Sequence, residues 1–394
     1  MTRYGIDRTD QVRTVLGGRR IGLATNPTGL DSDFRRTVSI LQDISNLACL
    51  FGPEHGVYGD AQAGEAVADS RDPRTGLPVH SLYGERREPS PDILAGLDAL
   101  VFDMQDVGLR WYTYPWTLSY LMQACARSGL PLVVLDRPNP LGGAVAEGLG
   151  MADDCRSFIG RFPLPARHGL TIGELARHLA RRHIPGVDLT VSPCAGWNPA
   201  GYWPDTGLAW VPPSPNLPTF DSVTAYAALA FLEGTTLSEG RGTTRPFETF
   251  GAPWLDNETL VHELEALDLP GLRWRPVHFV PAFSKFAGLP CRGVALHFRP
   301  GAALCQARPW AAGMQVHHLL KALHPAEYRP LPPWKEGSQP PLALLTGQHR
   351  LLGETTAADI LGQAQADCSA WLIERQADLL YDRSAKAVEK NDDN

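Results

Sequence analysis

The chain has 394 residues, of which 43% are hydrophobic, so it is long enough for about two domains with a sizeable core. Its net charge of −7 argues against a nucleic-acid-binding protein, which usually shows a basic face. No apolar run is long enough to span a membrane, and the N-terminal stretch has no secretory signal pattern. With scattered cysteines and no CxxC, these features indicate a cytoplasmic protein.

Short apolar runs alternate with helical patterns through the first half of the chain. The expected strands are, in order, RRIGLAT, NLACLF, LDALVFDMQDVG and PLVVLDRPNP. The expected helices are DFRRTVSILQDI, WTLSYLMQACARSG and TIGELARHLARRHI, the last starting at Thr171 with Glu174 at capping-box spacing. Apolar strands separated by helices predict βαβ units and an α/β fold with a parallel sheet buried on both faces.

The pattern changes after about residue 255. LRWRPVHFVP and CRGVALHFRP resemble strands with mixed alternation, GMQVHHLLKAL has helical spacing, and HPAEYRPLPPWKEGSQPP is a proline-rich connection. We therefore expect a parallel-sheet catalytic domain over residues 1–254 and a smaller α+β domain over residues 255–394.

Polar residues follow each of the four expected strands. In open α/β sheets ligands bind beyond the carboxyl ends of the strands, so these residues are expected to share one edge. They are Asn26; Glu54 and His55; Asp106, Arg110, Tyr112 and Tyr114; and Arg137 and Asn139. Any one of them can be structural, for example by capping a turn. Their coincidence on four strand ends favours a functional site.

The turn GPEHG places Glu54 between two glycines, just after the second strand. Glycine permits tight backbone angles and close approach of a ligand. A carboxylate in that position can act as a general acid, a base or a nucleophile. The alternative is a turn carboxylate that accepts hydrogen bonds from nearby amides. We favour the functional interpretation.

Two later loops carry further candidates. VPPSPNLPT is rigid and presents Asn216, and LEGTTLSEGRGTTRPFE holds Glu239, Arg241 and Thr243 among glycines. The second loop suits a carboxylate or sugar hydroxyls, although it can also be a well-bonded connection between domains. The sequence has no GxxxxGK[ST], GxGxxG, HExxH, Cys/His cluster or GxSxG, so we expect no nucleotide, metal or other cofactor.

Eight stretches, in fixed order, give the chain a specific resemblance. They are GLATNPTGL, LFGPEHGVYGD, TGLPVHSLYG, DVGLRWYTYPWTL, VLDRPNPLGG, RHGLTIGELA, PSPNLPT and EGTTLSEGRGTTRPFETFGAPW, between residues 22 and 254. By these motifs the chain resembles the DUF1343 family, the exo-β-N-acetylmuramidases of the NamZ type. The resemblance implies a Rossmann-like N-terminal domain, a smaller C-terminal domain and a cleft between them.

The resemblance also implies the reaction, which is release of terminal N-acetylmuramic acid from the non-reducing end of peptidoglycan fragments. Glu54 is then the leading catalytic residue and general acid, and Asp106, Glu147 and Glu239 are rival partners. The chain departs from common members where it reads VAEGLG around Glu147, and because it shows no secretion signal. A cytoplasmic member would act in cell-wall recycling.

A small muropeptide or amino-sugar substrate carries a lactyl carboxylate, for which Arg110, Arg137 and Arg241 are candidates because arginine binds carboxylates bidentately. Asn26, Asn139, Asn216 and Thr243 are candidates for hydroxyl and acetamido groups, with His55, Tyr112 and Tyr114 beside them. Two alternatives stay open: a non-catalytic muropeptide or sugar-binding protein, and a hydrolase acting on a different amino sugar or amide. Oligomeric state and stereochemical course are not predicted.

Overall fold

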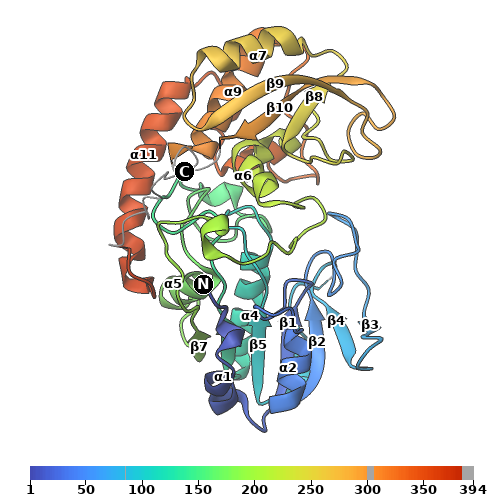
Figure 1. Ribbon diagram of the computed structural model, residues 1–394, viewed down its shortest axis with the longest axis vertical. Helices are drawn as coiled ribbons and strands as arrows, with labels where there is room; N and C mark the ends of the chain where they lie inside the picture. Colours follow the sequence, from blue (N-terminus) through green and yellow to red (C-terminus); the bar gives the residue numbers. More distant parts are fainter. Residues whose placement is uncertain (85, 300–305, 384–394) are drawn as a thin grey trace, which may run out of the picture.

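A computed structural model describes residues 1–84, 86–299 and 306–383. It contains a seven-stranded sheet in one half of the molecule and a three-stranded sheet in the other (Figure 1). The α/β fold expected from the first half of the chain is confirmed.

The large sheet has the strand order β3-β4-β2-β1-β5-β6-β7. Its strands are β1 (Arg20–Thr25), β2 (Asn46–Gly52), β3 (Ser70–Arg71), β4 (Pro78–Ser81), β5 (Ala99–Asp103), β6 (Leu132–Leu135) and β7 (Leu189–Ser192). All pairs are parallel except β3 with β4. The central strands are buried along almost their whole length, as expected for strands covered on both faces. β1 lies between β2 and β5, so Glu54 and Asp106 do not follow adjacent strands.

Helices cover both faces of this sheet. They are α1 (Thr9–Leu16), α2 (Thr37–Ile44), α3 (Pro91–Ala95), α4 (Tyr114–Ser128) and α5 (Ile172–Arg182). α1 and α2 lie in front of the strands in Figure 1, and α4 packs between α3 and α5 on the other side. The capping box expected at the start of α5 is confirmed, because Thr171 Oγ1 accepts from Glu174 N and a Glu174 carboxylate oxygen accepts from Thr171 N.

The small sheet is antiparallel, with the order β8-β10-β9. Its strands are β8 (Thr249–Ala252), β9 (Leu272–Phe279) and β10 (Cys291–Phe298). Around it lie α6 (Phe220–Leu229), α7 (Asn257–Ala266), α9 (Pro309–Leu323) and α10 (Pro341–Thr346). The expected division at residue 255 comes just after the end of β8, and it stays a prediction.

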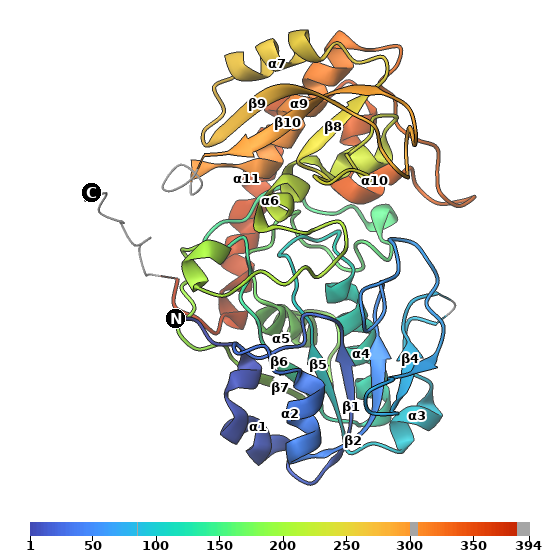
Figure 2. The same ribbon diagram turned by 45° about the vertical axis from the view of Figure 1, so that its right-hand side comes forward.

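The long helix α11 (Ala357–Glu374) joins the two halves. It contacts α9 beside the small sheet and leads into the 3-10 helix η6 (Arg375–Asp378), which packs on α5 beside the large sheet (Figure 2). Buried apolar side chains of both sheets, such as Leu23 and Val294, belong to one continuous core cluster. Among the described residues no helix is long and apolar enough to cross a membrane.

Candidate active site

The GPEHG turn leaves the end of β2 with a constrained backbone. His55 has a φ of 71°, a left-handed conformation that is uncommon outside glycine. Its ring is held at both nitrogens, by Ala61 O at 2.8 Å and by Ser214 Oγ at 3.1 Å. Burial lowers the pKa of His55, although the neighbouring Glu54 carboxylate opposes the shift. These contacts tie the turn to the proline-rich loop around Ser214 and stabilise the strained residue next to Glu54.

Glu54 is fixed from three directions. One carboxylate oxygen accepts the backbone N–H of Gly64 at 3.1 Å, and the other accepts the Thr113 hydroxyl at 2.8 Å. The Tyr83 hydroxyl is a further hydrogen-bond partner, and burial followed by the Glu54 charge raises the pKa of Tyr83. Tyr83 is therefore a neutral donor. The Glu54 side chain is 9% exposed, so the carboxyl faces a restricted space while keeping a defined orientation.

That space is a cleft of about 920 Å³, large enough for more than one sugar ring. Glu54 and Thr113 lie on the side of the large sheet, and the facing residues come from the chain between α6 and β8 and from the loop between β9 and β10. Among the described residues four glutamates and two basic side chains line it: Glu54, Glu65, Glu233, Glu239, Arg241 and Lys285.

The four charged residues opposite Glu54 form one ion-pair cluster. Arg241 binds a Glu233 oxygen with Nε at 2.8 Å and Nη2 at 2.5 Å, and its Nε lies 3.5 Å from Glu239. Lys285 Nζ binds Glu239 at 2.9 Å. Burial raises the pKa of Glu233, which Arg241 opposes, and the two carboxylates raise the pKa of Arg241.

Lys285 and Arg241 differ in whether they have hydrogen-bond donors without a partner. Lys285 Nζ also contacts the carbonyls of Leu232, Glu233 and Leu237, so its three donors are already shared among four acceptors. Arg241 Nη1 has no hydrogen-bond partner among the described residues. Of the two cations, Arg241 is therefore the one with an unused donor, and that donor is buried.

Aromatic rings line much of the remaining wall: Tyr83, Trp111, Tyr112, Phe158, Tyr226, Phe247, Phe283 and Trp334. Four of these rings are buried and two are half-buried, but Trp334 is 59% exposed and Phe283 is 42% exposed. These two exposed rings mark the open side of the cleft. Flat apolar rings beside carboxylates suit the faces and hydroxyls of a sugar.

Six residues expected from the sequence meet in this cleft: Glu54, His55, Tyr112, Asn216, Glu239 and Arg241. Tyr83, Lys285 and Trp334 join them, although none of the three was expected to be a site residue; Tyr83 belongs to the TGLPVHSLYG stretch. Tyr83 lies in the loop after β4, and the other two lie in loops of the second half. Only the folded chain brings them to Glu54.

Asp106 and Glu147, two of the three expected partners of Glu54, do not line the cleft. Asp106 accepts the backbone N–H of Gly108 at 2.9 Å and lies 3.6 Å from His168 Nε2. Glu147 forms a buried ion pair with Arg167 at 2.7 Å. Each carboxylate therefore has a partner inside the protein.

The other two arginine candidates are also engaged elsewhere. Arg110 is fully buried and donates to three backbone carbonyls, those of Leu149, Leu164 and Leu345. Its burial lowers the pKa of the guanidinium to about 10. Arg137 forms a bidentate pair with Asp103, at 2.6 and 3.0 Å. Neither guanidinium lines the cleft.

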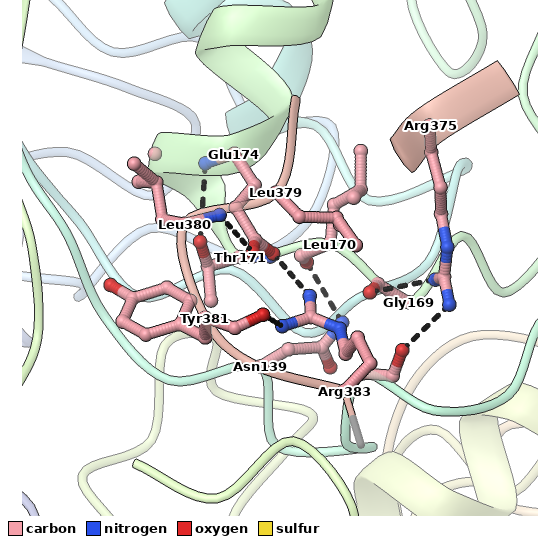
Figure 3. A network of polar contacts seen from close by, with 12 residues as sticks. Asn139, Gly169, Leu170, Thr171, Glu174, Arg375, Leu379, Leu380, Tyr381 and Arg383 are labelled. Atoms are coloured by element: carbon pink, nitrogen blue, oxygen red, sulfur yellow. Dashed lines mark hydrogen bonds and ion pairs between the residues drawn. The ribbon is translucent and has the colours of Figure 1, made fainter. Parts of the chain in front are cut away.

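The remaining expected residues bond within the protein and lie outside the cleft lining. Asn26, Tyr114, Asn139 and Thr243 contact, respectively, Thr28, Pro213 O, Leu170 O and Gly240 O. Figure 3 shows the Asn139 contact within a network that the C-terminal residues Leu380 and Arg383 share with Glu174.

Fold and site together define an α/β enzyme-like protein whose cleft combines carboxylates, one available arginine and sugar-sized aromatic walls. The family described as exo-β-N-acetylmuramidase NamZ matches the chain with its N-terminal part over residues 21–221 and its C-terminal part over residues 224–381. The chain belongs to this family.

Individual relatives agree with that assignment. The chain is 47% identical over 284 residues to the peptidoglycan β-N-acetylmuramidase NamZ of Bacillus subtilis (strain 168), covering 72% of this chain and 69% of that protein. Crystal structures of two DUF1343 family proteins from Bacteroides fragilis NCTC 9343 match with TM-scores of 0.87 and 0.76, at 33% and 29% identity. Each match covers 97% of this chain and 99% of the other.

Proposed function

We propose that this protein is a glycosidase that releases N-acetylmuramic acid from the non-reducing end of peptidoglycan fragments, acting on small muropeptide or amino-sugar substrates. The observation that carries the proposal is that Glu54, Glu239 and Arg241 line one cleft of about 920 Å³. The membership of the chain in the NamZ family supports the same reaction.

Glu54 is the proposed general acid. Cleavage of a glycosidic bond requires a proton on the departing oxygen, and a carboxyl group held at a fixed angle supplies it. Thr113, Gly64 and Tyr83 orient the Glu54 carboxyl.

Glu239 is the proposed partner, because it is the one of the three expected partners that lines the cleft with Glu54. Lys285 Nζ binds the Glu239 carboxylate at 2.9 Å and holds it in place. A fixed negative charge stabilises the positive charge that develops on the sugar in the oxocarbenium-like transition state. Glu233 is neutralised more directly by two contacts from Arg241 and therefore serves to position that arginine.

Arg241 is the proposed anchor for the lactyl carboxylate of the substrate. Among the residues that the structure describes, its Nη1 has no hydrogen-bond partner, whereas the three donors of Lys285 are shared among four acceptors and Arg110 and Arg137 bond elsewhere. The exposed rings of Trp334 and Phe283 then take the leaving-group sugar at the open side of the cleft. Asn216 and Tyr112 are proposed to contact the hydroxyl or acetamido groups.

The test measures how kcat depends on the acidity of the leaving group. Wild type, Glu54→Gln and Glu239→Gln are compared on a muramyl disaccharide and on aryl β-N-acetylmuramides whose phenols differ in acidity. An acid catalyst matters most for a poor leaving group. Glu54→Gln should therefore lose about 10²–10⁴-fold in kcat on the disaccharide and much less on the most acidic phenol. Glu239→Gln should lose activity to a similar extent on every substrate.

Glu65→Gln is the matched control, because it removes one negative charge from the cleft lining and leaves Glu54 unchanged. Near-normal turnover of the disaccharide by Glu54→Gln would exclude Glu54 from the chemistry. An equal loss on all leaving groups would exclude it as the acid. Binding without turnover by the wild type would instead identify a sugar-binding protein, and turnover of acetylglucosaminides alone would identify a different amino-sugar hydrolase.

A further inference from the structure

Three side chains of metal-binding type meet at a point outside the cleft. Asp154 and Cys155 lie on the 3-10 helix η2 (Asp153–Cys155), and His349 immediately precedes the 3-10 helix η5 (Arg350–Leu352). Cys155 and His349 are 194 positions apart in the sequence. One ligand atom from each of the three residues lies within 4.8 Å of the other two. None of the three lines the cleft that holds Glu54.

The distances fit a single small ion. The Cys155 Sγ to His349 Nε2 distance is 3.7 Å. A tetrahedral zinc ion, with bonds of about 2.3 Å to sulfur and about 2.0–2.1 Å to nitrogen, would separate those two atoms by about 3.6 Å. Asp154 Oδ2 lies 2.9 Å from the same His349 nitrogen and would move outward by about half an ångström to share the ion.

The three groups contact one another directly. A single ring nitrogen, Nε2 of His349, faces both the Cys155 thiol and the Asp154 carboxylate. Asp154 is also a hydrogen-bond partner of the Cys155 thiol. A cation between the three atoms would replace these hydrogen bonds with three ligand bonds, and sulfur, imidazole nitrogen and carboxylate oxygen are all zinc ligands.

The surrounding chain holds the three residues in position. Ala152 N donates to Gly347 O at 2.8 Å, and Gln348 Nε2 donates to Gly150 O at 2.8 Å. These bonds join the segments that carry the ligands. Cys155 is buried, whereas the side chains of Asp154 and His349 are 58% and 41% exposed. An ion can therefore enter from solvent, with a water as fourth ligand.

We propose that Asp154, Cys155 and His349 bind a zinc-like divalent cation that fastens residues 347–352 to residues 150–155. The role is structural. Leu345, four positions before His349, lines the cleft, so the cation would also stiffen one part of the cleft wall. The site does not depend on the identity of the substrate, and the proposal stands whether or not the protein cleaves muramides.

The test uses untagged full-length protein and Co²⁺ as a spectroscopic probe. Binding should saturate at one ion per chain with a near-ultraviolet sulfur-to-cobalt charge-transfer band and the visible bands of tetrahedral cobalt, and Zn²⁺ should displace it. Cys155→Ser should abolish the charge-transfer band. Asp154→Asn should weaken binding by more than about 100-fold, because even outer partners of metal ligands are worth about 10–100-fold.

Two further comparisons make the result decisive. Cys368→Ser is the matched control, since Cys368 is a buried cysteine whose thiol bonds Gly148 O, outside the proposed site, and it should keep the cobalt spectrum unchanged. Zn²⁺ should raise the Tm of wild type by a few degrees and leave that of Asp154→Asn unchanged. The absence of stoichiometric binding, a cobalt spectrum without the thiolate band, or equal affinity in Asp154→Asn would each overturn the proposal.

Discussion

Replacing Arg241 by methionine tests how the protein distinguishes an anionic sugar from a neutral one. Methionine keeps much of the apolar stem but removes the guanidinium, which lies over the Phe247 ring. A hydrogen bond between charged groups contributes about 1.5–3 kcal/mol. Because about 1.4 kcal/mol corresponds to a factor of ten, Arg241→Met should lower kcat/KM for a muramide by about 10–150-fold.

The same substitution also acts on Glu233, which loses both of its contacts to Arg241. Since Arg241 lowers the pKa of Glu233 against the effect of burial, the carboxyl should take up a proton more readily in the variant. The double variant Arg241→Met/Glu233→Gln removes the unpaired acid. It separates the loss of the anchor from the effect of a carboxylate that has lost its partner.

The assay compares N-acetylmuramic acid with N-acetylglucosamine, which differ by the lactyl group, as competitive inhibitors of aryl-muramide hydrolysis. Arg241→Met should weaken inhibition by the muramic acid and leave inhibition by the glucosamine close to wild type. Arg245→Met is the control, because Arg245 pairs with Glu248 and does not line the cleft. If the ratio of the two inhibition constants is the same in Arg241→Met and wild type, Arg241 is not the lactyl anchor.

Three further predictions follow from burial and contacts. Burial lowers the pKa of His317 to about 3, against about 6.5 unfolded, so its contribution to stability is present above pH 6.5 and is lost as the pH falls towards 3. Protonation of His317 in the unfolded chain should lower the free energy of unfolding by about 2 kcal/mol between pH 7.5 and 5. Urea titrations should show that the free energy of unfolding depends less on pH in His317→Gln than in wild type. The same pH dependence in both proteins would contradict the assignment. Trp334→Ala should raise KM for a muramyl disaccharide by about tenfold, since one stacked ring contributes about 1–3 kcal/mol, with an unchanged Tm because Trp334 is 59% exposed. The exposed Ile373→Ala is its control, and an unchanged KM would move the leaving-group sugar elsewhere. Lys285→Met removes the 2.9 Å partner of Glu239, which keeps its longer 3.5 Å contact with Arg241. Chemical denaturation should therefore show a loss of about 1.5–3 kcal/mol, and a loss below about 1 kcal/mol would show that the cluster is not structural.

Local physics accounts for the parts of the fold that were predictable. Runs such as RIGLAT are apolar because both faces of a central parallel strand are covered by other elements. The composition of such a run therefore predicts that the strand is buried. The cap at Thr171 depends on residues three positions apart. Glu54 could be singled out because its turn immediately follows β2, and the carboxyl end of such a strand is where ligands of α/β sheets bind.

Only the tertiary structure decided which polar residues at that sheet edge line the cleft and which bond within the protein. Asp106 and Arg137 follow strands just as Glu54 does, yet they bond within the protein, because what a strand-end side chain faces depends on the loops packed over it. Lys285 reaches the cleft from the loop between β9 and β10 in the distant half of the chain. His349 likewise meets Cys155 across 194 positions. Sequence patterns record local periodicity and chain neighbours, and contacts of this kind arise only when the two halves pack on one core.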